Sequence, residues 1–141
     1  MRYYNDSIAS SPSRTIAGLR SFKQKVILIA GGYDKHIPYD ALGPEIVEHV
    51  KTLLLTGDTA EKIKAATLAA ADYRPGAPEI ITCADLKEAV ERARAMARPG
   101  DVVIMSPASA SFDRFKNFAE RGNVFKALVN ALEEVMPESR L

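Results

Sequence analysis

Apolar residues along this chain alternate between short continuous runs and longer stretches with helical spacing. A run such as 25–30 is long enough for one buried strand and too short for a buried helix. The stretches between the runs place apolar residues three or four positions apart, which predicts amphipathic helices. The predicted strands are 2–4, 25–30, 50–55, 79–83 and 102–105. The predicted helices are 12–21, 39–50, 60–71, 85–97, 113–121 and 124–135.

Strand and helix alternate along the whole chain, which predicts a parallel sheet with right-handed crossovers and helices on both faces. We therefore expect an α/β fold, a three-layer, Rossmann-like domain with a mostly parallel sheet. The continuous apolar run 102–105 predicts a central strand, whereas 2–4 has the polar character of an edge strand. With 141 residues, the chain is expected to be one domain, 1–141, with a frayed tail from Pro137 onward.

Three single residues are expected to shape the ends of these elements. Thr59 and Asp85 precede predicted helices and can cap them. Gly122 is expected to break the chain into two helices, one ending at 121 and the next beginning at 124.

The charge balance excludes several classes of partner. The chain carries 19 Lys and Arg against 18 Asp and Glu, so it has no electrostatic footprint for nucleic acid or a membrane surface. We expect a small molecule or another domain as its partner. No run approaches the length of a membrane span, and the polar residues 3–13 argue against a signal peptide. Cys83 is the single cysteine, best explained as a small core residue, so a reducing cytoplasmic location is expected.

Polar loops follow three of the predicted strands: 5–12 (NDSIASSP), 31–35 (GGYDK) and 106–113 (SPASASFD). In a doubly wound sheet, such loops open at the carboxyl edge, where ligands bind. A lysine, hydroxyls and helix-start amides suit an anion such as a carboxylate. The candidate groups come from Asp6, Ser10, Lys35, Ser111 and the amides near Phe118.

On local evidence alone, each of these loops has a plainer interpretation. Residues 106–111 can be a tight turn in which the serines only cap, and Lys35 can be a solvated loop lysine. His36 is most simply a surface residue. Gly57 and Asp58 can contact a nucleotide, but a plain strand-to-helix turn is the better explanation of these two residues.

The chain lacks the motifs of a complete catalytic centre. It has no GxxxxGK[ST] loop, no GxGxxG, no nucleophile elbow and no carboxylate pair with a histidine base. We therefore expect it to supply substrate binding and closure to an enzyme, with phosphate and metal handled elsewhere. The isolated chain is expected to be inactive.

At the three polar loops the chain resembles the Mur ligase family, and within it the C-terminal domain of the D-glutamate-adding ligases. The resemblance covers nearly the whole chain. Its marks are Asn5-Asp6-Ser7 with Ala9-Ser10, then Gly31-Gly32-Tyr33-Asp34-Lys35, and the block that runs from Ser106 through Asp113 to Arg121-Gly122.

The resemblance implies a bacterial, cytoplasmic enzyme of peptidoglycan precursor synthesis. Such an enzyme uses ATP and Mg2+ to join D-glutamate to UDP-N-acetylmuramoyl-L-alanine through an acyl phosphate. ATP and Mg2+ are held mainly by a central ATPase domain, over which the C-terminal domain closes. The N-terminal and central domains are absent from this chain, and we expect Met1 to begin a segment of a longer protein, a natural start being the alternative.

The resemblance also implies roles for individual residues. Lys35 would pair with a carboxylate of D-glutamate, assisted by Ser10, which stands where the family often has threonine. Ser111 and the backbone around Phe118 would hold the side-chain carboxylate of D-glutamate. Arg121 would help to orient the same site.

Asp6 would face the nucleotide. Two positions depart from the family pattern. Many relatives have lysine where this chain has Ile8, so a charged contact from that position is absent or comes from another group. Ser109 replaces a common cysteine, which is a small-for-small change.

Two alternative functions stay open. A free-standing binding or interaction module can use the same fold without ligase activity. Another ligase of the family can add a different amino acid, although the GGxDK and SPASAS patterns favour D-glutamate.

Overall fold

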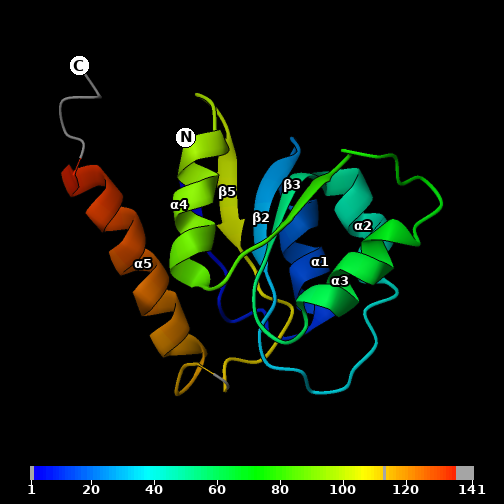
Figure 1. Cartoon of the computed structure of the whole chain (residues 1–141), viewed down its shortest axis with the longest axis horizontal. Coiled ribbons are helices and arrows are strands. Elements are labelled where there is room, and N and C mark those ends of the chain that lie inside the picture. Colours follow the sequence, from blue (N-terminus) through cyan, green and yellow to red (C-terminus); the bar gives the residue numbers. More distant parts are fainter. Residues whose placement is uncertain (1, 113, 136–141) are drawn as a thin grey trace.

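A computed structural model describes residues 2–112 and 114–135 of the chain, and within them strands and helices alternate (Figure 1). The strands are β1 (Arg2–Asn5), β2 (Val26–Ala30), β3 (Val50–Leu55), β4 (Glu79–Thr82) and β5 (Val102–Met105). The helices are α1 (Pro12–Arg20), α2 (Leu42–His49), α3 (Ala60–Leu68), α4 (Leu86–Met96) and α5 (Phe118–Val135).

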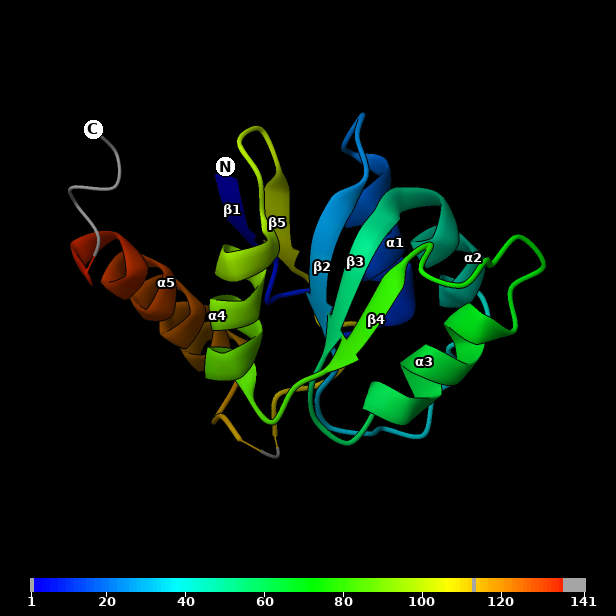
Figure 2. The same ribbon diagram turned by 45° about the horizontal axis from the view of Figure 1, so that its top comes forward.

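The five strands form one parallel sheet in the order β1-β5-β2-β3-β4, which Figure 2 shows side by side. Helices α1, α2 and α3 cover one face of the sheet, and α4 and α5 cover the other. The predicted three-layer α/β fold is therefore confirmed.

The core lies on both faces of the central strands, because side chains alternate along each strand. In β2, Leu28 faces α1 to α3, whereas Ile27 and Ile29 face α4 and α5. The strand pairs β2–β5 and β2–β3 align Leu28 with Ile104 and Leu53. Residues 102–105 form an interior strand, as predicted, and β1 is an edge strand with largely exposed residues.

The predicted helix 113–121 is wrong over its first residues. In the described part of this segment, the amides of Arg114 and Phe115 donate to the Ser111 carbonyl oxygen, so the chain makes a turn. Helix α5 begins only after Asn117, whose Oδ1 accepts a hydrogen bond from the Glu120 amide at 2.9 Å. The three-residue spacing of the phenylalanines therefore did not indicate a helix; the Asn117 cap decides where it starts.

The predicted break at Gly122 is also wrong, because α5 runs through it. A Cβ atom at Gly122 would lie 2.7 Å from Asn5 Nδ2, so this glycine allows β1 to approach the helix closely. The predicted tail from Pro137 lies outside the described residues. No helix in the described ranges is long and apolar enough to cross a membrane.

An ion pair joins the amino-terminal ends of β3 and β5. Lys51 Nζ lies 2.7 Å from Asp101 Oδ1, and the Arg98 amide donates to Asp101 Oδ2 at 2.8 Å. Burial by itself raises the pKa of Asp101, but the hydrogen bonds from Lys51 and the Arg98 amide outweigh it and hold this pKa below its ordinary value. A carboxyl group with a depressed folded-state pKa stabilises the fold above its unfolded pKa and loses this effect as pH falls.

We expect Asp101→Asn to lower the free energy of unfolding by about 1 kcal/mol at neutral pH, since the partner Lys51 is partly solvated. The difference from the parent should shrink as pH falls below about 4, the ordinary pKa of an aspartate side chain, because Asp101 becomes protonated in the parent. Urea unfolding at several pH values measures it. Asp40→Asn, at an exposed position, should match the parent throughout, and a difference at Asp101 that is independent of pH would contradict the assignment.

Candidate functional site

Backbone hydrogen bonds join three loops at the carboxyl edge of the sheet: the β1 loop (6–11), the β2 loop (31–41) and the β5 loop (106–112 and 114–117). The amides of Gly31 and Tyr33 in the β2 loop donate to carbonyl oxygens of the β5 loop, at 2.9 and 2.8 Å. The Ala108 amide donates to the Ala9 carbonyl oxygen at 2.9 Å. The prediction that the polar loops open on one edge is confirmed, with the β5 loop between the other two.

Asp6 fixes the start of the β1 loop. Its Oδ2 accepts a hydrogen bond from Ser106 Oγ at 2.7 Å, and Ser106 Oγ also lies 2.9 Å from Thr15 Oγ1 on α1. A Cβ atom at Gly18 would lie 2.8 Å from Asp6 Oδ2, so α1 packs directly against this carboxylate. The carboxylate therefore joins two loops, and its contact with a nucleotide stays a prediction.

Arg121 is buried, with 4% of its surface exposed, and it joins the β1 loop to the β5 loop. Its Nη2 and Nε donate to the carbonyl and hydroxyl oxygens of Ser7, at 2.7 and 2.9 Å. Its Nη1 donates to the Ser109 carbonyl oxygen at 2.9 Å. The Ser7 hydroxyl donates in turn to the Phe118 carbonyl oxygen at 2.6 Å. The guanidinium group thus fixes the backbone of the β1 loop relative to that of the β5 loop, the two loops that carry Ser10 and Ser111.

A buried group of hydroxyls joins the β2 and β5 loops to the start of α3. Ser109 Oγ lies 2.9 Å from the Tyr39 hydroxyl and 2.8 Å from Thr59 Oγ1. Thr59 occupies the N-cap position of α3, but its side chain makes no cap hydrogen bond, so that prediction is wrong. Its Oγ1 instead accepts from the Gly32 amide at 3.0 Å. The predicted cap at Asp85 is confirmed by its bond from the Glu88 amide.

Two predicted ligand groups are left available at this edge. Lys35 is exposed and makes no hydrogen bond or ion pair with the described residues. Ser111 is 4% exposed, and its hydroxyl has no hydrogen-bond partner in the described part of the chain. Ser111 lines a cavity of about 30 Å³, between the ends of β2 and β5, together with Gly31 and Arg121. A cation and a hydroxyl on adjoining loops can bind an anion.

The other predicted groups belong to the β1 loop and to the start of α5. Ser10 is half-buried and follows Ala9, whose carbonyl oxygen is bonded to the β5 loop. Phe118 begins α5, where the first amides have no acceptor within the helix. Its side chain is 46% exposed. The predicted site residues therefore share one edge, although the structure shows no direct contact among Ser10, Lys35 and Ser111.

The same loops also carry exposed apolar side chains. The rings of Tyr33 and Phe112 lie edge to face with centroids 5.9 Å apart, and both rings are exposed. Ile8, in the β1 loop, is 54% exposed, so this position offers no charge. The predicted anion site thus lies beside a partly apolar surface.

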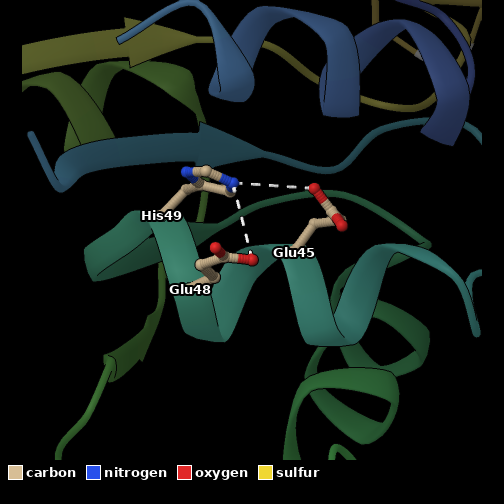
Figure 3. A group of neighbouring side chains, drawn as sticks. All are labelled: Glu45, Glu48 and His49. Atoms are coloured by element: carbon tan, nitrogen blue, oxygen red, sulfur yellow. Dashed lines mark ion pairs between the residues drawn. The ribbon is translucent and has the colours of Figure 1, made fainter. Parts of the chain in front are cut away.

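A second polar cluster lies on α2, where Glu45, Glu48 and His49 point toward one another (Figure 3). His49 Nε2 is 3.6 Å from Glu45 and 3.9 Å from Glu48. Both Glu45 oxygens accept hydrogen bonds from Arg20 on α1, at 2.8 and 2.9 Å. The hydrogen bond from Arg20 holds the pKa of Glu45 below its ordinary value. Through Glu45 and Arg20, the cluster therefore links α2 to α1.

Cys83 is buried at the end of β4, and burial raises the pKa of its thiol. A raised pKa disfavours the reactive thiolate. The interpretation of Cys83 as a core residue is consistent with this environment.

Comparisons with known proteins find a matching family model and similar sequences. Residues 1–109 match the family model described as "Mur ligase, glutamate ligase domain". The chain is 62% identical over 136 residues to a UDP-N-acetylmuramoylalanine--D-glutamate ligase of Acetivibrio thermocellus, with 94% of the chain covered. The ligases of the same name from Ruminiclostridium cellulolyticum and Clostridium botulinum strain Hall are 56% and 52% identical, again over 94% of the chain. The chain spans 29% of the length of each of these relatives.

A solved structure shows the same fold. It is a domain assigned to a UDP-N-acetylmuramate:L-alanyl-gamma-D-glutamyl-medo-diaminopimelate ligase from Haemophilus ducreyi, and it superposes with a TM-score of 0.53. The match covers 89% of both chains at 18% sequence identity. At this identity the likeness extends to the fold alone.

Proposed function

We propose that this chain, which belongs to the family of Mur ligase glutamate ligase domains, binds D-glutamate in an ATP-dependent ligase that adds it to UDP-N-acetylmuramoyl-L-alanine. The observation that carries the proposal is Lys35. It is an exposed cation without a partner in the described chain, on a loop joined by backbone hydrogen bonds to the loop that bears Ser111.

The chemistry of these residues suits a dicarboxylate. The Lys35 ammonium would pair with one carboxylate of D-glutamate, and the Ser10 hydroxyl would assist. The Ser111 hydroxyl and the backbone amides at the start of α5, around Phe118, would hold the side-chain carboxylate. Arg121 would orient this site through its bonds to Ser7 and Ser109.

Holding both carboxylates leaves the amino group of D-glutamate as the free nucleophile. ATP and Mg2+, held elsewhere in the ligase, would activate the carboxylate of the other substrate, and this chain would contribute the orientation of D-glutamate. Asp6 would lie toward the nucleotide while its carboxylate remains bonded to Ser106.

The remaining parts of the ligase would lie outside this chain, which spans 29% of its relatives. We propose that residues 1–141 are the C-terminal domain, and that N-terminal and central ATPase domains hold ATP and Mg2+. The exposed side chains of Ile8, Tyr33 and Phe112 beside the anion site offer apolar area for such closure. The protein would be cytoplasmic, and this domain would be inactive alone.

In the full-length ligase, Lys35→Ala should raise the Michaelis constant for D-glutamate by roughly 10- to 100-fold, because one charge-assisted hydrogen bond is lost. The Michaelis constant for ATP should change less than about twofold. Steady-state kinetics with each substrate varied in turn measures both values.

Lys23→Ala is the matched control, since it removes an equal charge from an exposed position beside the amino end of β2. It should leave both constants unchanged. Equal effects of Lys35→Ala on D-glutamate and ATP, or no effect, would refute the role assigned to Lys35.

A further inference from the structure

The loop that carries Lys35 is shaped by its neighbour Asp34. Asp34 Oδ1 accepts a hydrogen bond from the His36 amide at 2.7 Å. His36 has a φ of 59°, a left-handed conformation that is uncommon outside glycine. The side-chain bond from Asp34 therefore closes a turn around Lys35 and helps to stabilise an otherwise unfavourable backbone.

The second oxygen of Asp34 is bonded to a residue of another element. Lys62 Nζ, on the first turn of α3, lies 2.6 Å from Asp34 Oδ2. The Asp34 side chain is 17% exposed and the Lys62 side chain is 47% exposed. The hydrogen bond from Lys62, followed by that from the His36 amide, lowers the pKa of Asp34. The turn around Lys35 is thus attached to a helix that the sequence places more than two dozen positions away.

The charges of Asp34, Lys35 and Lys62 affect how strongly Lys35 can attract an anionic ligand. A bare carboxylate next to Lys35 in sequence would attract the Lys35 ammonium and repel an incoming carboxylate. His36 Nδ1 is 3.9 Å from Asp34 but 85% exposed, so it neutralises Asp34 weakly. Lys62 provides the short ion pair, and Lys35 stays without a partner in the described chain.

We propose that Lys62 is a positioning residue for Lys35: it holds and neutralises the Asp34 carboxylate, so that the Lys35 ammonium remains available to the substrate. The inference rests on the proposed function, because it takes D-glutamate as the anion that Lys35 binds. Lys62 itself does not touch the substrate in this proposal. It determines the affinity for D-glutamate through the turn 33–36.

The kinetic test uses Lys62→Met in the full-length ligase. This variant should raise the Michaelis constant for D-glutamate about fivefold, while kcat and the constant for ATP change less than about twofold. Lys62→Arg should restore the parent value, since it keeps a cation on α3. Lys64→Met, which removes a charge from the same helix without breaking a described ion pair, is the matched control and should behave as the parent.

A double-mutant cycle tests whether Lys62 acts through Asp34. Asp34→Asn keeps an oxygen that can accept from the His36 amide, but it removes the competing charge. It should leave the D-glutamate constant within about twofold of the parent, and adding Lys62→Met should then have no further effect. Equal effects of Lys62→Met in both backgrounds would overturn the proposal.

A measurement on the chain itself is independent of activity. In the 141-residue chain, Lys62→Met should raise the pKa of Asp34 measured by NMR, and the Lys64→Met control should not. An unchanged pKa overturns the proposal. If Lys35→Ala raises the D-glutamate constant and Lys62→Met does not, only this inference fails; if neither does, the proposed function fails as well.

Discussion

Replacing Arg121 by methionine should lower the free energy of unfolding by roughly 3 to 5 kcal/mol, because each buried carbonyl left without a donor costs about 1–3 kcal/mol. Methionine keeps an unbranched apolar stem but donates nothing. The carbonyl oxygens of Ser7 and Ser109, in residues that are 4% and 0% exposed, would lose their guanidinium donors. Urea unfolding of the chain measures the loss.

Arg114→Met is the matched control for this prediction. Arg114 is an exposed arginine of the β5 loop, and it donates to one carbonyl oxygen, that of Ala84, at 2.9 Å. Its removal should cost less than about 1 kcal/mol, because water can replace an exposed donor. Similar small losses in the two variants would show that Arg121 is not required to hold the loops together.

The sequence predicted the order of the elements better than it predicted where the helices begin and end. The order of strands and helices, the interior place of 102–105 and the edge place of 2–4 followed from hydrophobic runs, which report burial directly. Helix ends were less predictable. The phenylalanines at 112, 115 and 118 suggested a helical face, but the Asn117 cap and the Ser111 turn determine the local structure.

The prediction that Gly122 breaks the helix failed for a related reason. A glycine inside a helix is unfavourable locally, and the sequence alone does not show which neighbour requires it. Here the neighbour is Asn5, more than a hundred residues away in the chain. Tertiary contact therefore overrode the local preference.

The sequence also predicted only part of the candidate site: it indicated possible ligand-binding residues but not the residues that hold their loops in place. Lys35 and Ser111 were predicted as site residues because they lie in polar loops that follow buried strands, and parallel topology brings such loops to one edge. The partners that hold these loops, such as Thr59 with Gly32 and Lys62 with Asp34, were missed. They act across elements at no fixed spacing, and each has an ordinary local role as a cap or a surface charge. The sequence did offer one signal for the role of Asp34, because aspartate side chains commonly accept a hydrogen bond from the amide two residues later in a turn.

The second large effect is expected at Gly31, where β2 enters the loop that carries Lys35. Gly31→Ala should lower the free energy of unfolding by at least about 4 kcal/mol, from backbone strain and steric overlap together. Gly31 has a φ of 106°, and a Cβ atom there would lie 2.0 Å from the Thr56 carbonyl oxygen. The strand end must therefore move, and with it the Gly31 amide bonded to Pro107 at 2.9 Å.

Gly76→Ala separates the two causes. Gly76 has a φ of 79°, but a Cβ atom there would have nothing within 4 Å. Its substitution should cost only the backbone strain, about 1 to 2 kcal/mol. Urea unfolding of both variants measures the difference, and equal losses would show that the close approach to Thr56 is unimportant. Because the strain at Gly31 falls where the β2 and β5 loops meet, this variant in the full-length ligase should also weaken D-glutamate binding, whereas Gly76→Ala should not.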